Sequence, residues 1–301
     1  MITKLSSRTQ IVGDPEFSIL LLIDRINRSS GTMVNRNSHL LIGIADSKLS
    51  QARSHTKQWD QSEHADTWEQ LRMADTDQGT QVETAARETA RLLLDIKAVN
   101  FRPQEPYMLT AGWASPVYID CRWVISFPDA RSRIMDHAVS MLDRNVGFDT
   151  IDSVAGGETA GIPYAAWIAQ ATGKPMQYVR KKPKGFGRDA QIEGKLEEGN
   201  RVVLVEDLAT DGGSKVNFVN ALRKAGAEVS DAFVVFFYGV FPGALDGLKD
   251  IGVTLHYLTT WHEVLAEAEK GQDFSSEDIE GVRAFLEDPV AWSAAHGGRE
   301  S

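Results

Sequence analysis

The sequence of 301 residues contains a single cysteine, Cys121, and this scarcity excludes two kinds of structure. One thiol cannot form a disulfide within the chain, and it cannot build a metal site that needs several cysteines. We expect Cys121 to be a small buried hydrophobic residue.

Long hydrophobic runs are missing as well. The longest, residues 19–23, is far too short to span a bilayer. No positively charged segment followed by an apolar core opens the chain, so secretion is not expected. With 42% hydrophobic and 25% charged residues, the composition is that of a soluble globular protein. We expect the protein in the cytoplasm, with no membrane contact.

An excess of positive charge is also absent. The net charge of -10 argues against non-specific nucleic-acid binding by the whole chain. Residues 1–72 carry nine Lys/Arg and eight Asp/Glu, whereas the rest carries 23 and 34, or -11. Because residues 1–72 are polar with little periodicity, we expect an irregular or disordered extension before a domain at 73–301. One hypothesis is that Met73 is the natural start and that residues 1–72 are not part of the natural protein.

Strand-like and helix-like segments alternate beyond Met73. We expect helices at 82–96, 129–145 and 162–171 and from 214, with Asp129 capping the second, and further helices at the C-terminus. The expected strands are 107–110, 116–120, 150–155, 176–179, 202–205, 232–238 and 253–258. Such alternation is typical of an α/β fold with a mostly parallel sheet.

The segment 201–214 is the most informative about function. An apolar strand ends in two acids, Glu206 and Asp207, and a polar loop with Gly212 and Gly213 leads to a helix at Ser214. Glycine amides and a helix N-terminus bind anions, and ligands of parallel sheets bind where strands end. Two carboxylates would repel a bare phosphate, but they suit the hydroxyls or metal of a phosphorylated sugar.

The two common nucleotide-binding loops do not fit this chain. A Walker loop places its lysine before the Ser/Thr, whereas Lys215 follows Ser214. A dinucleotide fingerprint needs three spaced glycines, which neither residues 155–161 nor residues 201–214 provide.

A second segment, residues 178–194, concentrates positive charge in an acidic protein. It contains Arg180, Lys181, Lys182 and Lys184, followed by glycines, directly before the strand that carries the two acids. Such a loop is a candidate for gripping an anionic ligand. A solvated charge run is the alternative.

Residues 201–214 resemble the 5-phosphoribosyl-1-diphosphate (PRPP) motif of type I phosphoribosyltransferases. Three other segments, residues 109–118, 155–163 and 178–194, resemble segments of orotate phosphoribosyltransferase and occur in the same order as in that family. The resemblance to orotate phosphoribosyltransferase therefore extends from about residue 80 onward. The resemblance implies a type I phosphoribosyltransferase-like α/β fold, a mostly parallel twisted sheet flanked by helices, with a small N-terminal hood. It also implies a homodimer in which loop 180–194 reaches the neighbouring active site.

The resemblance also implies roles for residues. Glu206 and Asp207 would hold the ribose hydroxyls and stabilise the sugar's positive charge, and with Lys184 they would be the catalytic residues. Thr210 would also lie near orotate. Mg²⁺ would be held by the diphosphate and not by protein side chains alone. The PRPP-binding set would comprise Arg180, Lys181, Lys184, Glu206, Asp207, Leu208, Ala209, Thr210, Asp211, Gly212, Gly213 and Ser214.

The implied reaction transfers the 5-phosphoribosyl group of PRPP to orotate, giving orotidine 5′-phosphate and diphosphate in the biosynthesis of UMP. The chain departs from the family's pattern at Ala114, where a lysine is usual, at Phe186, where a histidine is usual, and in residues 233–242, which lack an arginine that contacts the base. Arg122 is a candidate replacement. Two alternatives stay open: transfer to another base, or a PRPP-sensing transcription regulator that uses residues 1–72 to bind DNA.

Overall fold

The computed structural model describes residues 79–109, 111–184, 191–210 and 213–300, all within the second of two units, residues 71–301. The expected extension at 1–72 and the hypothetical start at Met73 lie outside the described residues. So do four single positions discussed above: Thr110, Phe186, Asp211 and Gly212.

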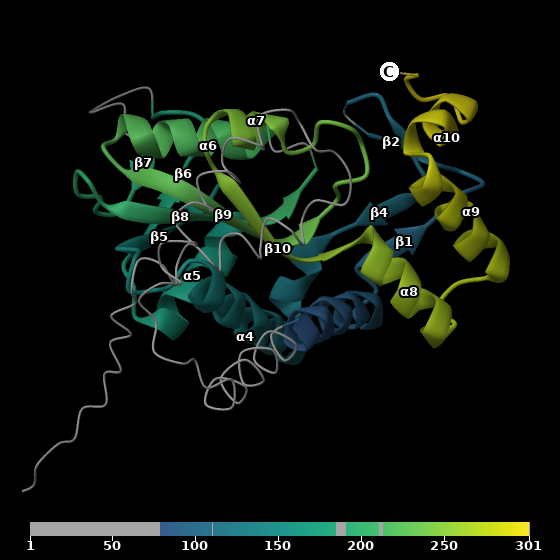
Figure 1. The fold of residues 1–301 in the computed structure, drawn as a ribbon, viewed down its shortest axis with the longest axis horizontal. Coiled ribbons are helices and arrows are strands. Elements are labelled where there is room, and N and C mark those ends of the chain that lie inside the picture. Colours follow the sequence, from purple (N-terminus) through teal and green to yellow (C-terminus); the bar gives the residue numbers. More distant parts are fainter. Residues whose placement is uncertain (1–78, 110, 185–190, 211–212, 301) are drawn as a thin grey trace, which may run out of the picture. The chain divides into compact units, whose positions relative to one another are not determined.

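A six-stranded sheet in the order β10-β9-β8-β5-β6-β7 forms the centre of the described unit (Figure 1). All neighbouring strands run parallel except β6 and β7. The expected α/β class with a mostly parallel sheet is therefore confirmed. The strands are β5 (Ser153–Gly157), β6 (Met176–Val179), β7 (Ile192–Glu193), β8 (Arg201–Ala209), β9 (Glu228–Phe237) and β10 (Thr254–Thr260).

Helices cover both faces of this sheet. On one face, α4 (Pro128–Asn145) and α5 (Gly161–Thr172) share a buried cluster with Val203 and Val205 of β8. On the other, α6 (Gly213–Lys224) and α7 (Asp246–Asp250) share a second cluster with Val202 and Leu204. Because side chains alternate along a strand, odd residues of β8 face α4 and α5, and even residues face α6.

Two expectations about local structure are corrected. Strand β8 continues to Ala209 instead of ending at Val205, because it stays paired with β9 through Ala209 and Phe237. Helix α4 begins at Pro128 after Phe127, so Asp129 lies within its first turn and is not the cap. Proline suits this position because the first turn of a helix has no use for its missing N–H.

The hood combines segments from both ends of the described unit. It contains a helix over residues 79–95, the antiparallel pair β1 (Val99–Phe101) and β4 (Val117–Ile119), and the hairpin of β2 (Tyr107–Met108) and β3 (Ala114–Ser115). The C-terminal helices α8 (Trp261–Gly271), α9 (Ser276–Glu287) and α10 (Pro289–Ala295) lie beside these strands, at the right of Figure 1. No helix in the described part of the chain has the length and apolar character needed to cross a membrane.

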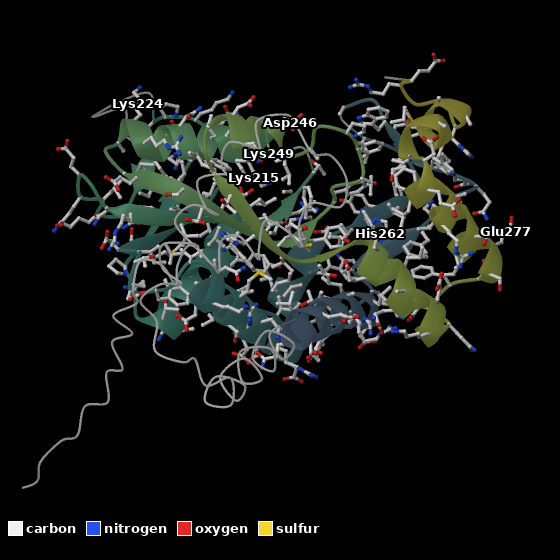
Figure 2. The ribbon with its side chains drawn as sticks, in the orientation of Figure 1. Lys215, Lys224, Asp246, Lys249, His262 and Glu277 are labelled. Carbon is white, nitrogen blue, oxygen red and sulfur yellow. The ribbon has the colours of Figure 1, made fainter. Side chains whose placement is uncertain are left out.

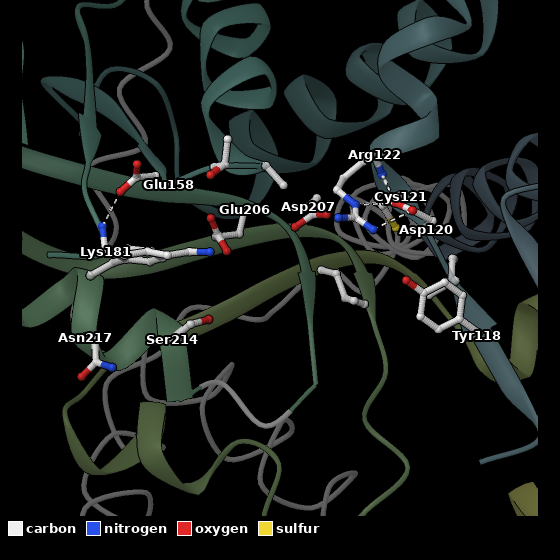
Figure 3. A pocket seen from close by; sticks show the side chains of 15 residues that line it. Tyr118, Asp120, Cys121, Arg122, Glu158, Lys181, Glu206, Asp207, Ser214 and Asn217 are labelled. Carbon is white, nitrogen blue, oxygen red and sulfur yellow. Dashed lines mark hydrogen bonds and ion pairs between the residues drawn. The ribbon is translucent and has the colours of Figure 1, made fainter. Parts of the chain in front are cut away.

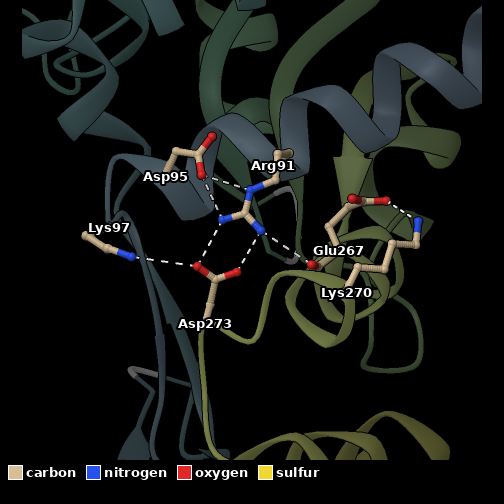
Figure 4. Close-up of polar contacts among 6 residues, drawn as sticks. All are labelled: Arg91, Asp95, Lys97, Glu267, Lys270 and Asp273. Carbon is tan, nitrogen blue, oxygen red and sulfur yellow. Dashed lines mark hydrogen bonds and ion pairs between the residues drawn. The ribbon is translucent and has the colours of Figure 1, made fainter.

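A group of polar contacts centred on Arg91 joins the helix over 79–95 to the turn between α8 and α9 (Figure 4). The two terminal nitrogens of Arg91 donate to the carboxylate of Asp273 at 2.6 and 3.0 Å, and its Nε donates to Asp95 at 2.9 Å. The hydrogen bond from Arg91 lowers the pKa of Asp273. The Asp273 side chain is only 11% exposed, so the pair is shielded more than a typical surface ion pair.

Candidate active site

A cavity of about 570 Å³ opens where β5 and β8 end and α5 and α6 begin (Figure 3). The 3-10 helix η1 (Cys121–Ser126) contributes its first residues to the wall. This is the place where open parallel sheets bind ligands. The lining residues are Tyr118, Ile119, Asp120, Cys121, Arg122, Glu158, Thr159, Ala160, Lys181, Glu206, Asp207, Leu208, Ser214, Asn217 and Phe218.

Glu206 occupies the side of the cavity nearest α6. It is 7% exposed, and its Oε2 lies 3.5 Å from the ammonium of Lys215. Its Oε1 is buried without a hydrogen-bond partner among the described residues. Gly157 and Gly161 lie against this carboxylate so closely that a Cβ at either position would overlap Oε1. Burial raises the pKa of Glu206 to about 7, although the charge of Lys215 opposes the shift.

Asp207 points to the opposite face of the same strand, toward η1. It lies near Cys121 and Arg122, and burial raises its pKa while the charge of Lys215 and two backbone N–H groups oppose the shift. Cys121 is buried, as expected, and burial raises the pKa of its thiol. The two acids, adjacent in sequence, therefore approach the cavity from different sides of β8.

The predicted PRPP-binding set is only partly gathered around the cavity. Ser214 lines it from the first turn of α6, whereas Thr210 is exposed beyond the end of β8 and Ala209 is buried against Val234 and Phe237. The residues that line the cavity are Lys181, Glu206, Asp207, Leu208 and Ser214. Those that do not are Arg180, Lys184, Ala209, Thr210 and Gly213, while Asp211 and Gly212 are not described.

Of the three predicted loop cations, one faces the cavity and two pair with Glu193. The backbone N–H of Lys181 donates to Glu158 at 2.7 Å, and the Lys181 side chain extends toward Glu206 (Figure 3). Arg180 and Lys184 instead form ion pairs with Glu193 of β7, at 3.6 and 2.5 Å. The hydrogen bond from Lys184 lowers the pKa of Glu193. In this state Glu193 holds the two cations that were predicted to bind diphosphate.

Several lining residues had no predicted role. Asn217 lies three positions after Ser214, so helical spacing could have placed it on the same face of α6. Tyr118 is the last residue of a segment that was recognised, and Asp120 follows that segment, but only the tertiary structure brings them to the cavity. Asp120 holds the Arg122 guanidinium by two hydrogen bonds of 2.6 Å, to Nε and Nη2.

The chain is similar over most of its length to three curated proteins named orotate phosphoribosyltransferase. The protein of Cereibacter sphaeroides (strain ATCC 17023) is 54% identical over 213 residues, which is 71% of this chain and 92% of that protein. The protein of Ruegeria sp. (strain TM1040) is 55% identical over 214 residues (71% and 95%), and that of Sinorhizobium medicae is 50% identical over 219 residues (73% and 94%). No family model matches the chain.

This chain belongs to the orotate phosphoribosyltransferase family. Solved structures support the fold assignment. The Aeropyrum pernix orotate phosphoribosyltransferase has a TM-score of 0.52 and 30% identity, covering 61% of this chain and 99% of that one. The Leishmania donovani UMP synthase has a TM-score of 0.57 and 29% identity, covering 67% of this chain and 42% of that one. The type I phosphoribosyltransferase-like fold is therefore confirmed.

The structure accounts for one departure from the pattern of orotate phosphoribosyltransferases. The segment after β9, which lacks the expected arginine, supports the hood instead. The Tyr238 hydroxyl forms a hydrogen bond with the buried Ser115 Oγ, and the Tyr238 ring stacks on Phe241 and meets Trp261 edge to face. Burial raises the pKa of Tyr238 above its usual value. Since Tyr238 is 4% exposed, its side chain does not reach the cavity.

Proposed function

We propose that this chain transfers the 5-phosphoribosyl group of PRPP to orotate and releases orotidine 5′-phosphate and diphosphate, as a step in the biosynthesis of UMP. The observation that carries the proposal is identity of 50–55% with curated orotate phosphoribosyltransferases, over more than nine-tenths of their length. The cavity supports it, because two carboxylates and the start of a helix meet there.

Residues of β8 and α6 would bind the ribose and the 5-phosphate of PRPP. Glu206 and Asp207 would accept hydrogen bonds from the ribose hydroxyls and stabilise positive charge as the bond from C1 to diphosphate breaks. Both residues line the cavity, where such hydroxyls would reach them. The backbone of residues 210–214, at the start of α6, would bind the 5-phosphate.

The leaving diphosphate would be bound by Lys181, which lines the cavity of its own subunit, and by Arg180 and Lys184 of the neighbouring subunit once they leave Glu193. Within the described residues, no group of three or more His, Cys, Asp or Glu side chains could hold a metal ion. Mg²⁺ would be carried by diphosphate oxygens, where it would neutralise the charge of the leaving group.

Orotate would bind between Tyr118, η1 and the end of β8. Its carboxylate requires a cationic donor, and Arg122 is the lining residue suited to that role, because Asp120 orients its guanidinium at the cavity wall. Thr210 would contribute to the same subsite. This assignment replaces the arginine that residues 233–242 lack.

A homodimer is the proposed assembly, with loop 180–194 of each subunit reaching the other's active site. Three exposed apolar residues support it: Trp123, Ile125 and Phe127 lie in η1 and at its end, with exposed fractions of 47, 38 and 39%. Large apolar side chains left exposed are often found at interfaces. Light scattering should give twice the chain mass, and Trp123→Ser should weaken the dimer whereas Tyr257→Ser, elsewhere on the surface, should not.

We further propose a cytoplasmic location, in keeping with the composition and the buried single thiol.

The assay is direct. Purified protein is mixed with PRPP, Mg²⁺ and orotate, and the loss of orotate absorbance is followed. Asp207→Asn and Lys184→Ala should reduce turnover by about 100-fold or more while the circular dichroism spectrum stays unchanged. If orotate is untouched while another base consumes PRPP, the base assignment is wrong. If Lys184→Ala keeps full activity, the basic segment is only a solvated surface.

A further inference from the structure

A buried lysine lies beside one of the two carboxylates of the site, Glu206. Lys215, in the first turn of α6, is 5% exposed, whereas Lys224 at the end of the same helix is exposed (Figure 2). The Lys215 ammonium donates to the carbonyl of Leu208 and lies 3.3 Å from Ser214 Oγ and 3.5 Å from Glu206 Oε2. It therefore joins the end of β8, the start of α6 and one of the two acids.

Burying an ammonium group costs free energy unless partners replace its water. An apolar side chain of similar volume would fill the same space without that cost. Three oxygens lie close to the Lys215 ammonium and partly replace its water. Lys215 is not among the residues that line the cavity, so we assign it no direct contact with PRPP.

We propose that Lys215 is a positioning residue for the transfer reaction: its ammonium fixes the Glu206 carboxylate in the charged form that receives the ribose hydroxyls, and it locks the start of α6 to the end of β8. This inference rests on the proposed function. It assigns the lysine no contact with substrate, and its effect passes through Glu206 and through the backbone that would bind the 5-phosphate.

The charges around Glu206 explain why one buried cation matters. Asp207 adds negative charge from the same strand, and Glu158 lies across the cavity. Lys181 also contributes positive charge near Glu206, but it is exposed and its charge is screened by solvent. Lys215 opposes the effect of burial more strongly than Lys181 does. Removing it should leave the Glu206 pKa well above about 7 and the carboxyl protonated at neutral pH.

The test compares Lys215→Met, Lys215→Gln and the matched control Lys224→Met on the same helix. For each protein, kcat/KM for PRPP is measured from about pH 5.5 to about 9.5, and PRPP binding is measured by calorimetry. We expect Lys215→Met to lose about 100-fold in kcat/KM at neutral pH. The acid limb of its pH profile, where kcat/KM falls with decreasing pH, should move upward by about one pH unit or more. Lys215→Gln should show the same movement, because it keeps a hydrogen-bond donor but not the charge. Lys224→Met should stay within about twofold of the unsubstituted protein.

An unchanged acid limb in a folded Lys215→Gln protein would overturn the inference, whatever the size of its activity. Should Lys215→Met fail to fold, Lys215→Gln and the binding measurement still decide. If the unsubstituted protein binds PRPP but leaves orotate untouched, the proposed function fails. The inference is then judged by PRPP binding alone: a Lys215→Gln affinity equal to that of the unsubstituted protein would overturn it.

Discussion

Ser293 Oγ accepts a hydrogen bond of 3.0 Å from the backbone N–H of Ala114, which joins α10 to a strand 179 residues earlier in the chain. Next to it, the Arg299 N–H donates to the Gly112 carbonyl at 2.9 Å, and the Arg299 guanidinium lies 4.5 Å from the centre of the Trp113 ring. The C-terminal segment thus covers the β2–β3 hairpin. Ala114 is fully buried there, which explains why a lysine would not fit at this position.

Gly298 should be necessary for this closure. A Cβ at Gly298 would overlap both Ser293 Oγ and the backbone nitrogen of Ala114. We expect Gly298→Ala to lower the free energy of unfolding by about 1–3 kcal/mol, the usual cost of overpacking. Urea denaturation measures the effect. Gly79→Ala is the control, since no atom of the described residues lies within 4 Å of a Cβ there. Equal midpoints for the two variants would show that the C-terminal segment does not hold the hairpin.

The pair formed by Arg91 and Asp273 should contribute to stability far more than its surface neighbours do. Arg91→Met removes both hydrogen bonds to a carboxylate that is 11% exposed, and we expect a loss of about 1–3 kcal/mol. Arg87→Met, on the same helix, breaks an exposed pair with Glu83 and should cost about 0.5 kcal/mol or less.

This contribution should depend on pH in a defined direction. Because the pKa of folded Asp273 lies below that of the unfolded chain, the stabilisation is present above about 3.9 and is lost as pH falls through the lower folded value. Denaturation midpoints of the unsubstituted protein and Arg91→Met should therefore converge in acid. A constant difference down to the lowest pH at which both fold would contradict this account.

Activity should depend on pH through Glu206. Its pKa is raised to about 7 by burial, so kcat/KM for PRPP should fall as pH decreases through that value, where the carboxyl becomes protonated. The same shift makes folding less favourable as pH rises from about 4.3 toward 7, since the folded state holds the proton more tightly. Glu206→Gln should have a low kcat/KM, and its kcat/KM should not fall with decreasing pH near this value. A limb near 7 that persists in this variant would assign it to another group.

Glu193 should compete with diphosphate for the loop cations. It holds Arg180 and Lys184 by ion pairs, so Glu193→Gln should free them and lower the KM for PRPP by about 2- to 5-fold, equivalent to less than about 1 kcal/mol. Glu197→Gln is a suitable control, because it removes a nearby exposed pair with Lys195. A higher KM in Glu193→Gln alone would mean that Glu193 orients the cations for binding.

Most of the central sheet could be predicted from local patterns. The strand at 176–179 has the expected bounds, and the other five-residue or longer strands of the sheet lie within a few residues of the expected positions. Their apolar side chains carry the signal, because both faces of a parallel sheet are covered. The short strands β1, β3 and β7 were missed, since two or three residues show no periodicity. The extent of β8 was underestimated, because its last residues include two acids.

The sequence was enough to identify the family, the strand–loop–helix that carries Glu206, Asp207 and Ser214, and the cationic segment that precedes it. These features are contiguous, so their spacing alone indicates their chemistry. The sequence could not show that the two acids face opposite sides of β8 or that Lys215 lies buried beside one of them. These relationships depend on strand pairing, helix packing and burial, which join residues that local patterns cannot connect.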